Sequence, residues 1–251
     1  MDFINTQTLV ISIAEFIVAI VSSIVQGGGN YIILPLLLSF GISPVTANAA
    51  LSLSNLGFSA GSVIGLKDEK ITDKKTLLVL MALGGITGLF VPYILVHMSA
   101  EYYGIFIGFF LFIIAPILHF KKFGIVSVET NTKQKIKGYI LLAILFIVAR
   151  FTLGVGALFT YVLCNYCGLT VLEANKTRKV SGFAGGTITS IGLILAGFVN
   201  WPVTIGLTLS AIIGAYIGTK ITVKKGNAWT AKALTITMLI SGVILIITSI
   251  K

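Results

Sequence analysis

Two stretches of the chain decide its expected fold: residues 27–48 read GGGNYIILPLLLSFGISPVTAN, and residues 154–175 read GVGALFTYVLCNYCGLTVLEAN. In each stretch, glycines precede an apolar piece of eleven residues (30–40 and 157–167), and a glycine-containing turn follows it. A helix of that length covers roughly 16 Å, about half of the hydrocarbon core of a bilayer. Glycine lets the backbone leave helical geometry, which a membrane tolerates only where the segment is buried in protein or lines a watery cavity. The competing interpretation of these glycines is that they let neighbouring helices pack closely through small residues.

The composition is that of an integral membrane protein. The chain has 251 residues, of which 56% are apolar and 10% charged, and its mean hydropathy is +1.03. A soluble domain carries about 25% charged residues, and a soluble fold of this length would leave much apolar surface facing water. These values exclude a soluble enzyme, a disordered chain and a disulfide-rich secreted module. The opening residues MDFINTQT lack a basic n-region, so the first apolar stretch is expected to be a retained span.

The rest of the chain reads as full-length spans arranged in an internal repeat. Apolar runs of about 20 residues predict helices at 8–26, 45–66, 76–97, 101–120, 138–153, 174–197, 202–221 and 230–250. A shift of 127 residues pairs Gly27 with Gly154, Gly41 with Gly168, Ala47-Asn48 with Ala174-Asn175, and Ser54 with Ser181. One gap-free register through these matches predicts two copies of one unit.

Charge indicates how the two copies are related. The loop 67–75 holds four lysines and its counterpart at 198–202 none, whereas the turn 97–101 has no Lys or Arg and its counterpart at 220–232 has four lysines. Under the positive-inside rule, equivalent loops then face opposite sides of the membrane, which requires an odd number of crossings per half. If each short piece counts as a crossing, each half has five crossings. The rival count, with four spans per half and re-entrant short pieces, would need equivalent loops to match in charge.

We therefore predict an all-α polytopic membrane protein of about ten crossings in two inverted five-helix repeats, each with a short glycine-interrupted broken helix. Residues 1–120 form the first repeat, 121–137 a basic cytoplasmic linker, and 138–251 the second repeat. Both termini are expected on the extracytoplasmic side. Of the 18 Lys and Arg residues, sixteen lie in four segments expected in the cytoplasm: 67–75, 121–137, the start of 174–197, and 220–232. The net charge of +10 is thus explained by topology rather than by a nucleic-acid partner.

An inverted repeat with a broken helix in each half is typical of a secondary transporter whose substrate binds near the midplane. Helix N-termini at the breaks would favour an anion. Glu15 and Arg150 are the two ionisable side chains that we place inside spans, where a charge is costly and marks a pathway or a pair. We expect Arg150 to face the anionic substrate and Glu15 to relay a proton or balance charge. The alternative is a structural ion pair between them.

The other expected substrate-binding residues are glycines and polar side chains beside the two breaks. They are Gly27, Gly28, Gly29, Asn30, Asn48, Ser52 and Asn55 in the first half, and Thr152, Gly154, Gly156, Asn175 and Ser181 in the second. No metal or other cofactor is expected, because His97 and His119 are isolated at span ends. Cys164 and Cys167 read as small apolar core residues, although a membrane dithiol electron carrier would use the same spacing. A passive anion channel is the third interpretation.

The glycine motifs also resemble those of the TauE/SafE sulfite-exporter-like permeases. That family shows a glycine-rich run, a proline in the next short helix and then Gly-x-x-Pro-x-x-Ala, which here are Gly27-Gly28-Gly29, Pro35 and the stretch 41–47. The resemblance implies a transporter rather than an enzyme, moving sulfite, a sulfonate or a related organic anion across a prokaryotic inner (plasma) membrane. The expected partners are that small anion, the lipid bilayer and, as an open alternative to a monomer, a second copy in a homodimer.

Overall fold

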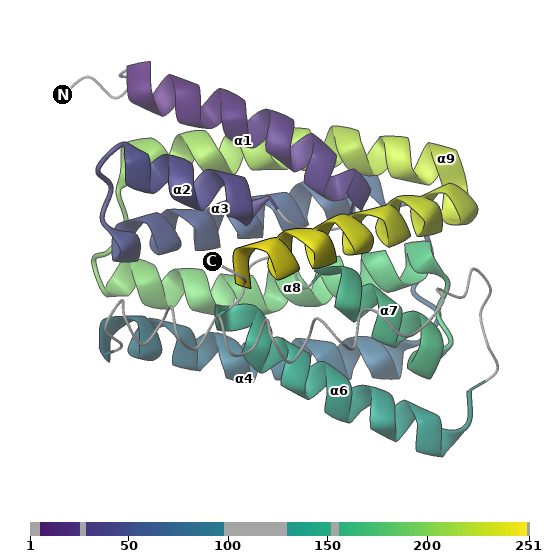
Figure 1. Cartoon of the computed structure of the whole chain (residues 1–251). Coiled ribbons are helices and arrows are strands. Elements are labelled where there is room, and N and C mark those ends of the chain that lie inside the picture. Colours follow the sequence, from purple (N-terminus) through teal and green to yellow (C-terminus); the bar gives the residue numbers. More distant parts are fainter. Residues whose placement is uncertain (1–5, 26–28, 98–129, 152–155, 250–251) are drawn as a thin grey trace.

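Helices are the only regular secondary structure in the residues that the computed structural model describes, which are 6–25, 29–97, 130–151 and 156–249 (Figure 1). The predicted span 101–120 lies outside these residues. The helices are α1 (Thr6–Val25), α2 (Asn30–Ser39), α3 (Pro44–Gly65), α4 (Lys74–His97), α6 (Thr132–Phe151), α7 (Gly156–Cys167), α8 (Val171–Leu195) and α9 (Trp201–Ser249). The short helices α2 and α7 correspond to the two predicted short pieces.

The helix boundaries repeat along the chain. Helices α1 to α4 begin at residues 6, 30, 44 and 74, and helices α6 to α9 begin at 132, 156, 171 and 201, so corresponding helices start 126 or 127 residues apart. Helix α9 is broken at Gly226, whose φ of 79° and ψ of 179° are not helical. This break falls between the two spans predicted at 202–221 and 230–250.

Helix α6 begins earlier than predicted. The expected span started at 138, after a linker that ended at 137, whereas the helix begins at Thr132. Its start is fixed by a reciprocal cap: the Asn131 side chain accepts from the Gln134 backbone N–H at 2.9 Å, and the Gln134 side chain accepts from the Asn131 N–H at 3.0 Å. Such a cap starts a helix whatever the polarity of its first turns. The apolar run alone therefore placed the boundary too late.

Small residues let the long helices approach closely. Helix α9 packs against α1 and α3, and α8 packs against α4 and α3. Gly214 and Gly218 of α9 lie against the backbone of α1, Gly61 of α3 lies against the backbone of α9, and Gly185 of α8 lies against Gly84 of α4. Because lipid tails are as apolar as the side chains, the hydrophobic effect does not hold helices together within a membrane. Close backbone contact of this kind therefore supplies much of the energy of helix association.

Two buried apolar clusters form the core, and each contains a short helix. One holds Ile33 and Leu37 of α2 among residues of α1, α3 and α9. The other holds Leu163 of α7 among residues of α4, α6 and α8, with the rings of Phe146 and Phe159 packed edge to face at 4.8 Å. The two short helices are therefore integral to the packing.

The outer faces of the bundle are apolar. Large aliphatic side chains are exposed at helical spacing: Ile13, Ile17 and Val21 on α1; Ile136, Ile140 and Ile144 on α6; and Ile205, Leu209 and Ile213 on α9. Within the described part of the chain, α1 and residues 201–233 of α9 are long and apolar enough to cross a membrane. Continuous apolar faces of this kind are suited to lipid and poorly suited to water.

Candidate functional site

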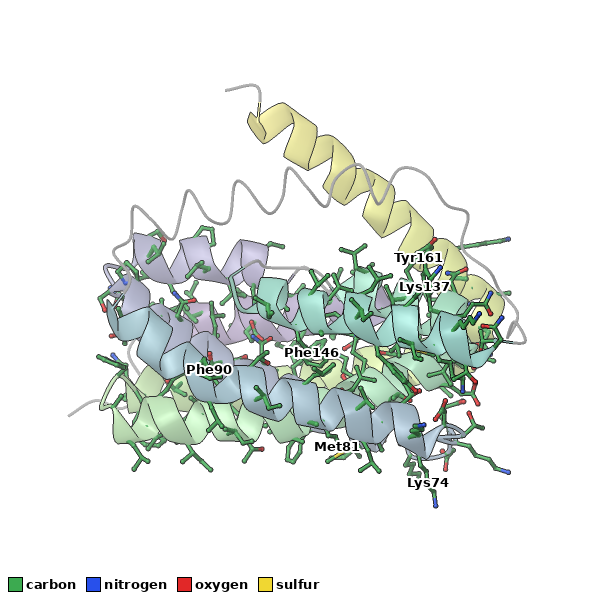
Figure 2. All side chains as sticks on the ribbon, turned by 90° about the horizontal axis from the view of Figure 1, so that it is seen from below. Lys74, Met81, Phe90, Lys137, Phe146 and Tyr161 are labelled. Atoms are coloured by element: carbon green, nitrogen blue, oxygen red, sulfur yellow. The ribbon has the colours of Figure 1, made fainter. Side chains whose placement is uncertain are left out.

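The described residues of the four basic segments gather at one end of the bundle, here called the basic end. Figure 2 shows Lys74 of α4 and Lys137 of α6 toward this end and Phe90 of α4 toward the other. The loop between α3 and α4 contacts the other three segments. Two ion pairs join it to α6 and α9: Asp73–Lys135 (2.7 Å) and Asp68–Lys220 (3.6 Å). Hydrogen bonds join it to the start of α8: Thr72 donates to Glu173 (3.0 Å), and Lys176 Nζ donates to the carbonyl oxygens of Lys67 (3.1 Å) and Glu69. Helix α3 therefore ends where its counterpart α8 begins.

Asp73 both caps α4 and pairs with α6. Its carboxylate accepts from the Thr76 backbone N–H at 2.9 Å and from Lys135 Nζ at 2.7 Å. Burial raises the pKa of this carboxyl, but the hydrogen bonds from Lys135 and Thr76 lower it by more, so the pKa lies below its ordinary value of 3.8. The charged form is thus favoured by folding.

Replacing Asp73 with Ala is expected to destabilise the fold by about 1 kcal/mol, chiefly through the lost helix cap. Because folding lowers the pKa of Asp73, its stabilisation is present above pH 3.8 and is lost as the pH falls through the lowered value. Thermal unfolding in detergent at pH 7 and pH 3 measures both effects. Asp68→Ala is the control, since that exposed ion pair is worth little. Equal unfolding temperatures for wild type and Asp73→Ala at pH 7 would contradict this role.

The turns after the two short helices have the same geometry. Gly41 and Gly168 both have positive φ, 78° and 74°, a conformation that glycine adopts without a Cβ clash. Two residues later, the Ser43 and Thr170 side chains cap α3 and α8 by accepting from the backbone N–H three residues on. Both short helices are thus followed by the same turn and the same kind of cap, at the offset that relates the two sequence copies.

Glu15 is buried at the centre of the first half. Its carboxylate is 7% exposed and accepts a 2.8 Å hydrogen bond from Ser54 Oγ on α3. Ser54 is itself 2% exposed, and its Oγ lies 3.5 Å from the Leu207 carbonyl oxygen on α9. A hydroxyl has one proton and can donate to only one of these oxygens at a time. The sequence therefore predicted a buried acid at position 15, and the tertiary structure shows that Ser54 is its hydrogen-bond partner.

The other predicted site residues have different surroundings. Asn175 and Ser181 are buried, Asn30, Asn48 and Ser52 are partly buried, and Asn55 is exposed. Asn48 donates to the Pro44 carbonyl and Ser181 to the Arg178 carbonyl, both within their own helices. Gly29 packs the start of α2 against Ser22 and Val18 of α1, which is a packing role. Gly156 begins α7.

Several predicted residues lie outside the described part of the chain. They are Gly27, Gly28, Thr152 and Gly154, together with the side chain of Arg150. The predicted pairing of Arg150 with Glu15 or with a substrate is therefore not tested by the structure.

Helix α8 buries a lysine, Lys179, that was expected at the cytoplasmic start of the helix. The span was predicted from 174, but α8 begins at Val171 with a capping box formed by Thr170 and Glu173. Lys179 consequently lies about 12 Å along the helix, and it is 4% exposed. Its Nζ lies 3.6 Å from the centre of the Phe58 ring on α3. Lys179 is therefore a buried ionisable residue beyond the two predicted ones, Glu15 and Arg150, and the T-x-x-E cap at 170–173 is the signal that could have found it.

Two polar neighbours lie beside Lys179 on α8. Counted from Asn175, Arg178 is residue i+3 and Lys179 is residue i+4. This spacing places all three side chains on one face of α8. Arg178 Nη2 donates to Asn175 Oδ1 at 3.3 Å, and Asn175 is 1% exposed. This face therefore carries an amide, a guanidinium and an ammonium group.

The two cysteines lie in the second apolar cluster. Cys164 and Cys167 are free, and each is 3% exposed. Within the described residues, no group of three or more His, Cys, Asp and Glu side chains could hold a metal ion. Buried thiols among apolar side chains are typical of core packing.

Together, the helical bundle, its apolar outer faces and its few buried charges fit the class of integral membrane proteins. The chain belongs to the sulfite exporter TauE/SafE family, whose model matches residues 11–245. Members of this family are membrane transporters, which places the chain among the membrane permeases. No curated protein and no solved structure matches the chain.

Proposed function

We propose that the protein is a secondary transporter that moves sulfite, a sulfonate or a related small organic anion across a prokaryotic inner membrane by alternating access. The observation that carries this proposal is the pair of half-length helices, α2 and α7, at equivalent places in the two halves. Each is followed by the same turn and the same cap, so the likeness extends to backbone geometry. Broken helices related in this way form midplane substrate sites in transporters built from inverted repeats.

The relation between α3 and α8 supports the inverted arrangement. Helix α3 runs toward the basic end, whereas α8 starts there, so equivalent helices run in opposite directions relative to it. With the basic end in the cytoplasm, the positive-inside rule gives about ten crossings and two extracytoplasmic termini. Inverted halves can exchange their conformations, and this exchange opens a central site to each side in turn.

Glu15 is the proposed coupling residue. When ionised, its carboxylate accepts from Ser54 Oγ; when protonated, it can donate to Ser54, whose hydroxyl then turns toward the Leu207 carbonyl. Both protonation states are therefore hydrogen-bonded without movement of a helix. A buried carboxyl that is satisfied in both states is suited to carry a proton through the membrane.

Transport in proteoliposomes tests this function. The full chain is reconstituted and offered sulfite, sulfoacetate, thiosulfate and acetate, and we expect uptake of at least one of the sulfur oxyanions. Arg150→Ala should lose that uptake at unchanged expression, and Arg150→Lys should restore little, because an ammonium lacks the planar fork of a guanidinium. The double variant Cys164→Ser/Cys167→Ser should transport normally. Failure of the wild type on every anion would overturn the proposal, and loss of function in the double cysteine variant would favour the dithiol carrier.

A further inference from the structure

Lys179 is a buried cation without a carboxylate partner among the described residues. It is 4% exposed, and the ion pairs in the described part of the chain are Asp73–Lys135 and Asp68–Lys220. A charge held away from water is costly unless it is paired and hydrogen-bonded. The described part of the fold therefore buries the Lys179 amine with no carboxylate paired to it.

The sequences of the neighbouring helices explain why no partner is present. The helices that pack against α8 are α3, α4, α7 and α9, and none of them contains Asp or Glu. The one acidic residue of α8 is Glu173, which is bonded to Thr170 and Thr72 at the basic end. A small movement of these helices would therefore bring no carboxylate from them to Lys179.

The contact with Phe58 accounts for only part of the cost of burial. An ammonium 3.6 Å from the centre of a ring is a good cation–π geometry. A ring face, however, accepts no conventional hydrogen bond, and an ammonium has three donors to satisfy. The Phe58 contact thus orients Lys179 while leaving donors available to a ligand.

We propose that Lys179 is the charged centre of a binding site for a small oxyanion at the contact between α3 and α8, with Asn175 and Arg178 as further donors on the same face. The inference rests on the proposed transport function and adds residues that recognise the anion besides Arg150. Ammonium, guanidinium and amide N–H groups on one face suit a ligand that presents several oxygen acceptors close together. Helices α3 and α8 are equivalent in the two repeats, so the site lies at the boundary between the halves, where alternating access requires it.

This site lies close to the proposed coupling residue. Phe58, which contacts Lys179, stands one helical turn after Ser54, which holds Glu15. Residues four apart on a helix are neighbours, with Cβ atoms about 6 Å apart. Helix α3 therefore contacts the anion-binding cation and the proton-binding carboxylate on adjacent turns.

The test measures both stability and transport of Lys179→Met, which keeps the apolar stem and removes the charge. For wild type purified in detergent, sulfite should raise the unfolding temperature, because a ligand that binds the native state stabilises it. In Lys179→Met the unfolding temperature without sulfite should be unchanged or higher, and the response to sulfite should be lost. In proteoliposomes the KM for sulfite should rise by about tenfold or more, as expected for losing a charged hydrogen bond. Lys179→Arg should restore part of the sulfite response.

Lys74→Met is the control, because Lys74 is exposed at the basic end and should leave both measurements unchanged. If Lys179 only stacks on Phe58 to hold the helices together, Lys179→Met will unfold at a lower temperature and keep the wild-type response to sulfite, which overturns the inference. If Lys179→Met transports sulfite with the wild-type KM, the inference fails while the transport function stands. If the wild type neither binds nor transports any of the offered anions, the proposed function fails first and this inference with it.

Discussion

Replacing Glu15 with Gln is expected to abolish proton-driven accumulation of the anion while leaving anion exchange across the membrane in place. Glutamine preserves the size of the side chain and can hydrogen-bond Ser54, but it cannot take up or release a proton. The buried carboxylate is the one acidic side chain of α1, and α2 and α3 carry no charged residue. The charged residues of α9 are Lys220, Lys224, Lys225 and Lys232, around its break at the basic end.

The size of the effect follows from the driving force. A pH difference of about two units supplies about 2.8 kcal/mol per proton, so one coupled proton supports roughly 100-fold accumulation. Glu15→Gln should reduce this ratio to about one in vesicles with an imposed pH gradient. Exchange of labelled for unlabelled sulfite at equal pH reports whether the variant still binds and moves the anion.

Glu173→Gln is the matched control for this experiment. Glu173 is also a helix carboxylate, but it caps α8 at the basic end, and glutamine can replace glutamate in a capping box. That variant should accumulate sulfite as the wild type does. Gradient-driven accumulation by Glu15→Gln at the wild-type level would remove Glu15 from coupling. An uncoupled wild type would instead identify a passive channel.

Replacing Gly61 with Ala is expected to destabilise the protein by about 3 kcal/mol, the upper range for overpacking. A Cβ at Gly61 would overlap the backbone carbonyl of Ile212 on α9, which cannot turn aside as a flexible side chain can. Helices α3 and α9 would have to separate, and their close contact would be lost. The shift in the unfolding temperature of the purified protein measures this loss.

Gly186→Ala is the control for this prediction. Gly186 also lies at a helix contact, between α8 and α3, but a Cβ there would meet Leu56 Cδ1 at an ordinary 3.5 Å. Because alanine is a better helix former than glycine, this variant should be neutral or up to about 1 kcal/mol more stable. The same substitution thus has opposite effects at two helix contacts. Similar stability of the two variants would show that the α3–α9 approach is looser than the structure indicates.

The two short helices could be predicted from the sequence because their signals are local. Glycines, a length of eleven residues and a repeat at 127 residues specified α2 and α7 before any contact was known. The start of α6 was missed because its reciprocal Asn131–Gln134 cap lies in a polar segment that apolar periodicity does not detect. For the same reason the start of α8 was placed three residues too late, and Lys179 was grouped with the cytoplasmic start of that helix rather than with the buried ionisable residues.

The sequence by itself determined the membrane class, the repeat and the buried acid at position 15, because hydropathy, glycine spacing and isolated charge are properties of short segments. Only the tertiary structure decided which groups meet. Ser54 is 39 residues from Glu15 along the chain, and Phe58 is more than a hundred residues from Lys179, so no local pattern relates either pair. Burial of a charge depends on which helices surround it. Helices α3 and α8 came together because small residues allow their backbones to approach, and that packing left Lys179 buried with no carboxylate paired to it in the described part of the chain.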